Sequence, residues 1–185
     1  MKVLTLEPKQ FSAACRELAG QVGAASFVPG MVVGIQSGGE YVAREVIAAF
    51  PGAMLSLVGL QRPSTSRKSL LQPLFRHLPL RMLDLLRMAE SRILALRPRR
   101  RISRIEIDPS LRAMLPARVL VVDDAVDSGA TMAAVVDALH RARPDIEVRT
   151  AVITVTTSRP AVMPDFALYK DKTLIRFPWS MDMKK

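Results

Sequence analysis

The sequence predicts an α/β fold, a mostly parallel sheet flanked by helices. Short apolar runs recur along the chain, and most are followed by a segment with apolar residues at helical spacing. The run at 119–122, Val-Leu-Val-Val, has no polar face, which is typical of a strand buried on both sides in a parallel sheet. With 185 residues, of which 49% are hydrophobic, the chain is long enough for one well-packed domain and short for two.

Helices and strands are predicted to alternate through the first sixty residues. Residues 8–22 have the pattern of an amphipathic helix, because residues 11, 14, 15, 18 and 22 are apolar and share one face. The apolar run 31–35 is predicted to be a strand, and a helix is expected at 41–50. Residues 54–60 form the next predicted strand.

One segment, residues 62–104, carries the whole net charge of the chain. The chain has a formal charge of +10, and this segment holds 12 Lys and Arg against only Asp84 and Glu90. Residues 79–97 are predicted to form a helix with an apolar stripe, and the alternating residues 102–107 a strand. The segment is therefore a basic helical insertion, suited to an acidic partner, to assembly or to covering a site.

The stretch from 119 to 131 carries the strongest chemical signal. Asp123 and Asp124 follow the apolar run, the turn Asp127-Ser128-Gly129-Ala130-Thr131 comes next, and a helix is predicted at 132–143. A turn that leads into a helix presents backbone N–H groups and a positive dipole end to an anion. Ligands of open α/β sheets bind at the carboxyl ends of the strands. We therefore predict a phosphate-binding loop beside two carboxylates that hold hydroxyls or a metal.

A second strand, loop and helix unit lies upstream. The loop Gln36-Ser37-Gly38-Gly39 follows the strand at 31–35, and its consecutive glycines allow backbone geometries that other residues resist. Alone, such a loop is a weak indication of phosphate binding. Its position ahead of the acidic stretch makes it a candidate second phosphate site.

The stretch 119–131 closely resembles the phosphoribosyl-pyrophosphate (PRPP) motif of type I phosphoribosyltransferases. The resemblance implies that Asp123 and Asp124 handle the ribose hydroxyls and Mg²⁺, and that residues 127–131 wrap the 5′-phosphate. The loop Ser37-Gly38-Gly39 resembles the family's pyrophosphate loop. Gln36 departs from the Arg or Lys often found before that loop. The implied fold is a single domain over 1–185, with the basic segment 62–104 in place of the family's flexible loop.

The end of the chain resembles the C-terminal hood of the xanthine–guanine and hypoxanthine-type enzymes. A strand at 148–155 is followed by Pro-Asp-Phe at 164–166 and an apolar run that ends in Pro178-Trp179, so the hood is expected at 160–185. By this resemblance Leu174, Ile175 and Trp179 would contact the acceptor. Leu174 stands where a stacking ring is expected, and no Lys occurs at 154–157. Alternatively, Phe177 and Trp179 are core residues.

The function implied by the resemblance is Mg²⁺-dependent transfer of ribose 5-phosphate from PRPP to a nitrogen nucleophile, a purine-like base, with release of pyrophosphate. Asp127 would be the catalytic residue, either stabilising the ribose cation or acting as general base. Alternatively, it caps the following helix. A rival function is a PRPP-sensing regulator that binds RNA or DNA through residues 62–104.

The basic segment leaves several partners open. It is either a lid over the site, a nucleic-acid surface, or a helix for homo-oligomer assembly, partner docking or membrane-surface docking. No transmembrane span and no signal peptide is recognisable, so a cytoplasmic protein is expected. The single Cys15 excludes an internal disulfide and suits a reducing compartment. His77 and His140 lie far apart, which argues against a zinc site.

Overall fold

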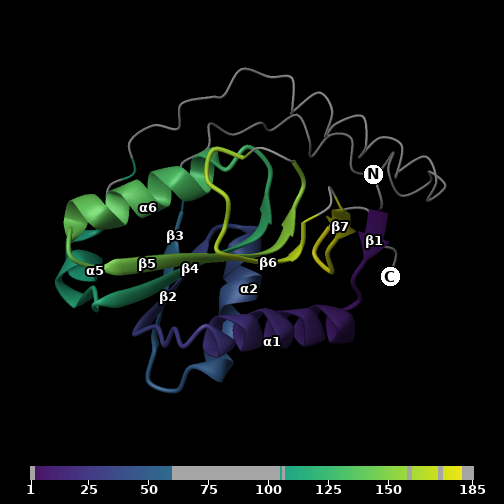
Figure 1. Cartoon of the computed structure of the whole chain (residues 1–185), viewed down its shortest axis with the longest axis horizontal. Helices are drawn as coiled ribbons and strands as arrows, with labels where there is room; N and C mark the ends of the chain where they lie inside the picture. The colour runs from purple at the N-terminus through teal and green to yellow at the C-terminus, as the bar shows by residue number, and fades with distance from the viewer. Residues whose placement is uncertain (1–2, 60–104, 106, 158–159, 171–172, 181–185) are drawn as a thin grey trace.

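A five-stranded parallel sheet forms the centre of the molecule (Figure 1). The computed structural model describes residues 3–59, 105, 107–157, 160–170 and 173–180. The strand order is β3-β2-β4-β5-β6, and every neighbouring pair is parallel. The strands are β2 (Met31–Ile35), β3 (Met54–Val58), β4 (Arg118–Val126), β5 (Glu147–Val155) and β6 (Phe166–Tyr169). The predicted α/β class with a parallel sheet is confirmed.

Helices cover both faces of this sheet (Figure 1). One face carries α1 (Pro8–Ala24) and α2 (Gly38–Val46), after which a short 3₁₀ turn spans Ile47–Ala49. The other face carries α5 (Pro109–Met114) and α6 (Ala130–Ala142). Among the described helices, none is long and apolar enough to cross a membrane.

Strand β4 shows why the central run has no polar face. Leu120 and Val122 pack in the core beneath α1 and α2, whereas Val119 and Val121 pack in the core beneath α6. All four side chains have no exposed surface. Successive side chains of a strand point to opposite faces, so a strand between two helical layers must be apolar at every position.

Several element boundaries differ from the predicted ones. Helix α2 begins at Gly38 instead of residue 41, and β4 extends to Val126, so both aspartates lie within the strand. Strand β1 (Val3–Thr5) and helix α5 were not predicted. Of the expected strand at 102–107, the described residues Ile105 and Ile107 are not in a strand. The helix predicted at 79–97, like the rest of 62–104, lies outside the described residues.

The expected hood at 160–185 divides between two sheets. Strand β6 joins the central sheet beside β5. Strand β7 (Leu174–Arg176) instead pairs in parallel with β1, and together they form a separate two-stranded sheet, the hood sheet. The Thr154 hydroxyl, near the end of β5, donates a hydrogen bond of 2.7 Å to the Thr173 carbonyl oxygen. This bond ties the start of β7 to the carboxyl edge of the central sheet.

Candidate functional site

The two predicted phosphate loops leave neighbouring strands at the same edge of the sheet. Strands β2 and β4 are adjacent and parallel, with Gly34 opposite Val122. The loop after β2 leads into α2, and the loop after β4 leads into α6 on the opposite face. Chain from both sides of the sheet therefore converges at the carboxyl ends of β2 and β4. This is the position at which open α/β sheets bind ligands.

The glycine loop packs directly against the acidic pair. A Cβ atom on Gly38 would overlap the Asp124 carboxylate, and one on Gly39 would lie 2.6 Å from the Val122 carbonyl oxygen and 3.0 Å from the Asp123 Cα. Both glycines are buried. The absence of side chains therefore lets the start of α2 contact β4, and it places Asp123 and Asp124 beside the loop at 37–39. The peptide bond between Gln36 and Ser37 is cis.

The electrostatics of Asp124 follow from this close packing. Burial raises the pKa of its carboxyl group above the ordinary 3.8, and the nearby Asp127 carboxylate adds to the rise. Hydrogen bonds to the carboxylate act in the opposite direction but are outweighed. The Asp124 backbone N–H donates to Asp123 Oδ1 at 2.9 Å. An anionic pair held together in this way attracts a cation or hydroxyl donors.

Replacing the half-buried charge of Asp124 should raise stability while weakening ligand binding. Because its folded pKa is raised, Asp124 contributes most to stability when protonated, below about pH 4, and that contribution is lost as pH rises through the raised pKa. Asn is neutral at every pH. We expect Asp124→Asn, without ligand or Mg²⁺, to have a higher free energy of unfolding than wild type at pH 7. The difference should shrink near pH 4.

Chemical denaturation at the two pH values measures this effect. PRPP affinity should fall by roughly 10- to 100-fold, since a hydrogen bond to a charged group is worth about 1.5–3 kcal/mol. A variant that is less stable than wild type at pH 7 would contradict the electrostatic argument. Unchanged PRPP affinity would instead remove Asp124 from the binding site.

The second loop is shaped by Gly129. Its φ of 74° is in the left-handed region, and a Cβ atom there would lie 2.9 Å from the Val162 nitrogen. The Ala161 N–H donates to the Ser128 carbonyl oxygen at 2.7 Å, so residues 161–162 pack over the loop. Helix α6 then begins at Ala130, and Thr131 lies in its first turn. The N–H groups of a first helical turn have no partner within the helix and are available to an anion.

Asp127 is exposed at the start of this loop and does not cap α6. The N-cap residue is Gly129, which has no side chain to cap the helix, and the Ala130 N–H donates to the Ser128 hydroxyl oxygen at 3.4 Å. The Asp127 carboxylate instead accepts a hydrogen bond from the Thr156 hydroxyl, at the end of β5. The capping interpretation of Asp127 is therefore wrong, because the helix starts two residues later than a cap at 127 would require. The Asp127 carboxylate lies between the carboxyl ends of β4 and β5.

The paired carboxylates of the site are suitable ligands for Mg²⁺. Asp123 and Asp124 supply adjacent carboxylates, and Mg²⁺ is usually held by one or two carboxylates together with substrate phosphates and water. Within the described ranges, no group of three or more His, Cys, Asp or Glu side chains could hold a metal alone. The residues fit a metal that arrives with a phosphorylated substrate.

The three predicted acceptor residues lie in or beside the hood sheet. Leu174 and Ile175 are buried in β7. The Trp179 ring is stacked on Tyr41 and on Phe177, at centroid distances of 4.3 and 4.9 Å, and the Phe11 ring meets it edge-on. These contacts give Trp179 a packing role and link the hood to the first turns of α2.

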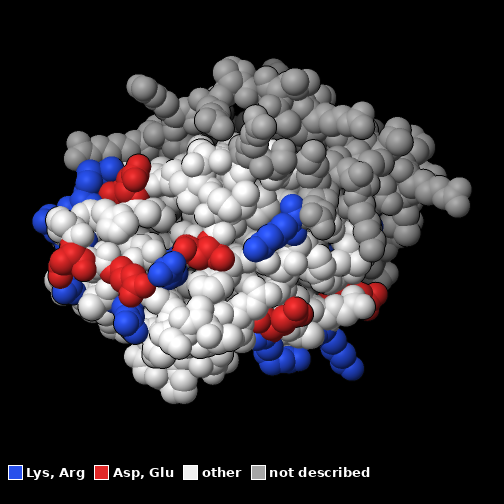
Figure 2. All heavy atoms as spheres, viewed as in Figure 1, with Lys and Arg blue, Asp and Glu red and all other residues white. Residues whose placement is uncertain are grey.

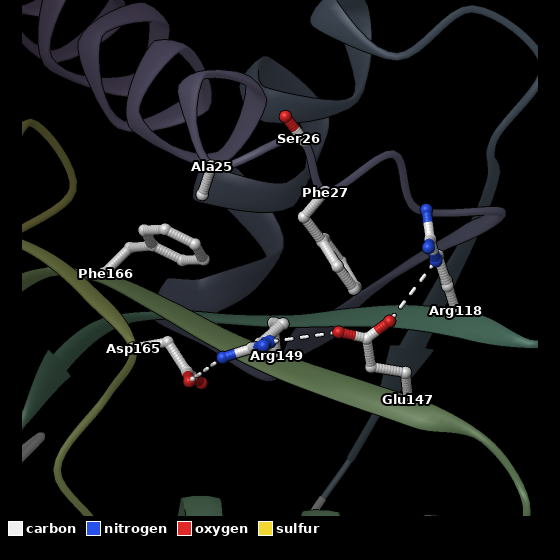
Figure 3. Close-up of a pocket in the computed structure, with 8 residues that line it drawn as sticks. All are labelled: Ala25, Ser26, Phe27, Arg118, Glu147, Arg149, Asp165 and Phe166. Carbon is white, nitrogen blue, oxygen red and sulfur yellow. Dashed lines mark hydrogen bonds and ion pairs between the residues drawn. The ribbon is translucent and has the colours of Figure 1, made fainter.

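A pocket of about 350 Å³ lies at the opposite, amino edge of the sheet (Figure 3). Its charged side chains form a continuous chain of ion pairs: Arg118 to Glu147 at 3.2 Å, Glu147 to Arg149 at 3.3 Å, and Arg149 to Asp165 at 3.1 Å. Figure 2 shows acidic and basic side chains interspersed at this end of the molecule. These charged side chains already pair with one another across β4, β5 and the start of β6. The pocket therefore offers no unpaired charge among them to attract a ligand.

Sequence reasoning missed the residues that later segments bring to the site. Thr156 bonds to Asp127, and residues 161–162 pack over Gly129. A usable signal existed for Thr156, because it directly follows a buried strand, and parallel strands end at a common edge. No comparable signal marked residues 161–162. For Tyr41, the only sequence signal was its position three residues after Gly38, which would place it close to the glycine loop on a helix.

This fold and site define a class: an α/β protein in which two helix-initiating loops meet beside paired carboxylates at the carboxyl edge of a parallel sheet. Residues 4–185 match the family model described as the phosphoribosyl transferase domain. The chain belongs to this family and is a phosphoribosyltransferase. No curated protein matches it.

Solved structures show the same fold at low sequence identity. The purine phosphoribosyltransferase of Pyrococcus horikoshii Ot3 is 18% identical, with a TM-score of 0.64 and coverage of 97% of this chain and 95% of that one. The xanthine-guanine-hypoxanthine enzyme of Helicobacter pylori is 19% identical, with a TM-score of 0.63 and the same coverage. The orotate enzyme of Aeropyrum pernix is 16% identical, with a TM-score of 0.51, covering 90% and 74%. The similarity thus extends to enzymes with different acceptors.

Proposed function

We propose that this protein transfers ribose 5-phosphate from PRPP to a ring nitrogen of a purine-like base and releases pyrophosphate, with Mg²⁺ as cofactor. The observation that carries the proposal is the packing of Gly38 and Gly39 against Asp123 and Asp124, beside the left-handed Gly129 loop. This arrangement offers one region for pyrophosphate, one for ribose hydroxyls and one for the 5′-phosphate. Ser37, Ser128, Ala130 and Thr131 complete the proposed PRPP-binding set.

The chemistry divides among these groups. The bond between ribose C1 and pyrophosphate breaks, a bond from C1 to the acceptor nitrogen forms, and the acceptor loses a proton. Asp127 would take that proton as a general base, or stabilise the positive charge that develops at C1. Backbone N–H groups at the starts of α2 and α6 hold the phosphate groups without reorganising during the reaction.

The metal would be held by Asp123 and Asp124. When bound, it supplies positive charge that stabilises the leaving pyrophosphate. The raised pKa of Asp124 indicates that its ionised form is destabilised without a cation. This supports the proposal that a cation belongs beside the carboxylate pair.

The acceptor would enter from the side of the hood sheet. We propose that Leu174 and Ile175 hold β7 against the core, and that Trp179, fixed by Tyr41, limits the size of the acceptor space. The structures of purine and orotate enzymes support a nucleobase acceptor. A purine is the narrower proposal, because two of the three solved structures named above are of purine phosphoribosyltransferases.

A screen of nucleobases with Mg²⁺ and PRPP, read by pyrophosphate release, tests this function. Purine bases should support release, and the product should be a base linked to ribose 5-phosphate. Orotate and non-aromatic amines serve as comparison acceptors in the same assay. Absence of release with every acceptor would reject the transferase proposal.

Thr131→Val tests the phosphate loop separately from the chemistry. The substitution keeps a β-branched side chain in the first turn of α6 and removes only the hydroxyl. We expect PRPP affinity to fall by about 1.5–3 kcal/mol, because the lost hydrogen bond goes to a charged phosphate. Isothermal titration with Mg²⁺ present measures the change. Wild-type affinity in the variant would show that the 5′-phosphate does not contact this residue.

The concentration of positive charge in residues 62–104 favours a second candidate function. A PRPP-sensing regulator would bind RNA or DNA there, with affinity that falls steeply with salt and responds to PRPP. The same segment could instead close over the site, form a homo-oligomer, or dock on a partner or membrane surface. Sedimentation at low and high salt, with and without duplex RNA, separates these roles. A cytoplasmic location fits the free, buried Cys15.

A further inference from the structure

Thr156 is joined to the Asp127 loop by backbone and side chain together. Its N–H donates to the Val126 carbonyl oxygen at 3.0 Å, which continues the pairing of β4 with β5. Its hydroxyl donates to Oδ1 of the Asp127 carboxylate and lies 3.4 Å from the same Val126 carbonyl oxygen. The residue thus spans the point at which β4 ends and the loop begins.

We propose that Thr156 is a positioning residue that fixes the Asp127 carboxylate for proton transfer. The inference rests on the proposed function, in which Asp127 is the catalytic group. It assigns a purpose to a residue that lies outside both predicted phosphate loops.

The need for such a residue follows from the surroundings of Asp127. The side chain is exposed, residues 127–129 have no regular secondary structure, and the helix begins only at Ala130. An aspartate in this position would sample several rotamers, whereas a general base must stay within hydrogen-bond reach of one proton. The bond from Thr156 selects one orientation and uses Oδ1. Oδ2 is then the atom that takes the proton.

Thr156 is well suited to hold another side chain. Its backbone is fixed by the last residues of β5, where Val155 pairs with Val126. Its β-branched side chain has few rotamers, so a fixed backbone also fixes the hydroxyl. A hydroxyl bound to a carboxylate forms a charge-assisted hydrogen bond, which is stronger than a neutral one.

Turnover of Thr156→Val and Thr156→Ser tests the proposal. Val keeps the shape and removes the donor, so kcat should fall by roughly 10- to 100-fold, the scale of loss for a misplaced catalytic group. The KM for PRPP should stay within about twofold of wild type, since the residue contacts Asp127 instead of the phosphate loops. Ser restores the hydroxyl and should recover most of kcat. Thermal unfolding and PRPP titration of each variant establish that fold and binding are intact.

A double substitution separates positioning from general structural support. In an Asp127→Asn background there is no base to position, so adding Thr156→Val should change kcat by less than about twofold. A further loss as large as that in the wild-type background would overturn the inference, as would wild-type kcat in Thr156→Val or no recovery in Thr156→Ser. If the wild-type enzyme releases no pyrophosphate with any acceptor, both the proposed function and the positioning role are rejected. An active wild type with an unaffected Thr156→Val rejects the positioning role alone.

Discussion

The Asp127→Asn variant is expected to turn over at roughly 1% of the wild-type rate or less, while unfolding at nearly the wild-type free energy. Removing a general acid–base group usually costs 10²- to 10⁴-fold in rate. The amide cannot take a proton from the acceptor at neutral pH and carries no charge to stabilise the ribose cation. Its oxygen still accepts the hydrogen bond from the Thr156 hydroxyl, and no helix cap is lost because Gly129 is the N-cap residue.

Steady-state pyrophosphate release and chemical denaturation measure the two quantities on the same preparation. PRPP titration provides the control, and affinity should stay within a few-fold of wild type because the phosphate loops are unchanged. Normal turnover would remove Asp127 from the chemistry. If stability and turnover both fall strongly, the Asp127 carboxylate maintains the structure of the loop instead of acting in the chemistry.

The second large effect is expected for Gly39→Ala. The new methyl group would lie 2.6 Å from the Val122 carbonyl oxygen and 3.0 Å from the Asp123 Cα, both backbone atoms of β4 that cannot rotate away. Helix α2 must therefore move off the strand, at a cost of about 1–3 kcal/mol of stability. The shift separates the glycine loop from the carboxylate pair, so PRPP binding should fall at least tenfold.

Gly20→Ala provides the matched control. Gly20 lies within α1, and a Cβ atom there would have no atom within 4 Å. The same chemical change should stabilise the protein by about 0.5–1 kcal/mol, since Ala is the better helix former, and should leave PRPP binding unchanged. Opposite signs in the two variants would attribute the Gly39 effect to contact with β4. Equal effects would contradict the packing argument.

Local sequence was sufficient to predict the parts of the site that are built from consecutive residues. The unbroken apolar run of β4 required burial on both faces, and the acidic residues and glycine that follow it were expected near the carboxyl end of the strand. The start of α2 was predicted three residues late because glycine is a poor helix former. In the structure, close packing against β4 outweighs that preference at Gly38 and Gly39.

The remaining features depend on contacts between distant segments, which a single sequence does not encode locally. Strand β1 has only three residues and gains its place by pairing with β7. Strand β6 was assigned to the hood because it lies beside β7 in sequence, yet its ladder partner is β5. Thr156 belongs to no motif; its position after a buried strand places it at the edge of the sheet, but its hydrogen bond to Asp127 becomes visible only when β5 is aligned with β4.

The pairing of β1 with β7 has a consequence for the order of folding. The Arg176 guanidinium donates to the Thr5 hydroxyl at 2.9 Å, a contact between residues 171 positions apart. Closing so long a loop costs entropy that only a nearly complete native structure can offset. The strand pairs of the central sheet join residues at most 88 positions apart, whereas the hood sheet must wait for both ends of the fold. We expect amide hydrogens of β1 and β7 to exchange sooner than those of β2 and β4, which would place the proposed acceptor side of the enzyme in its least stable cooperative unit.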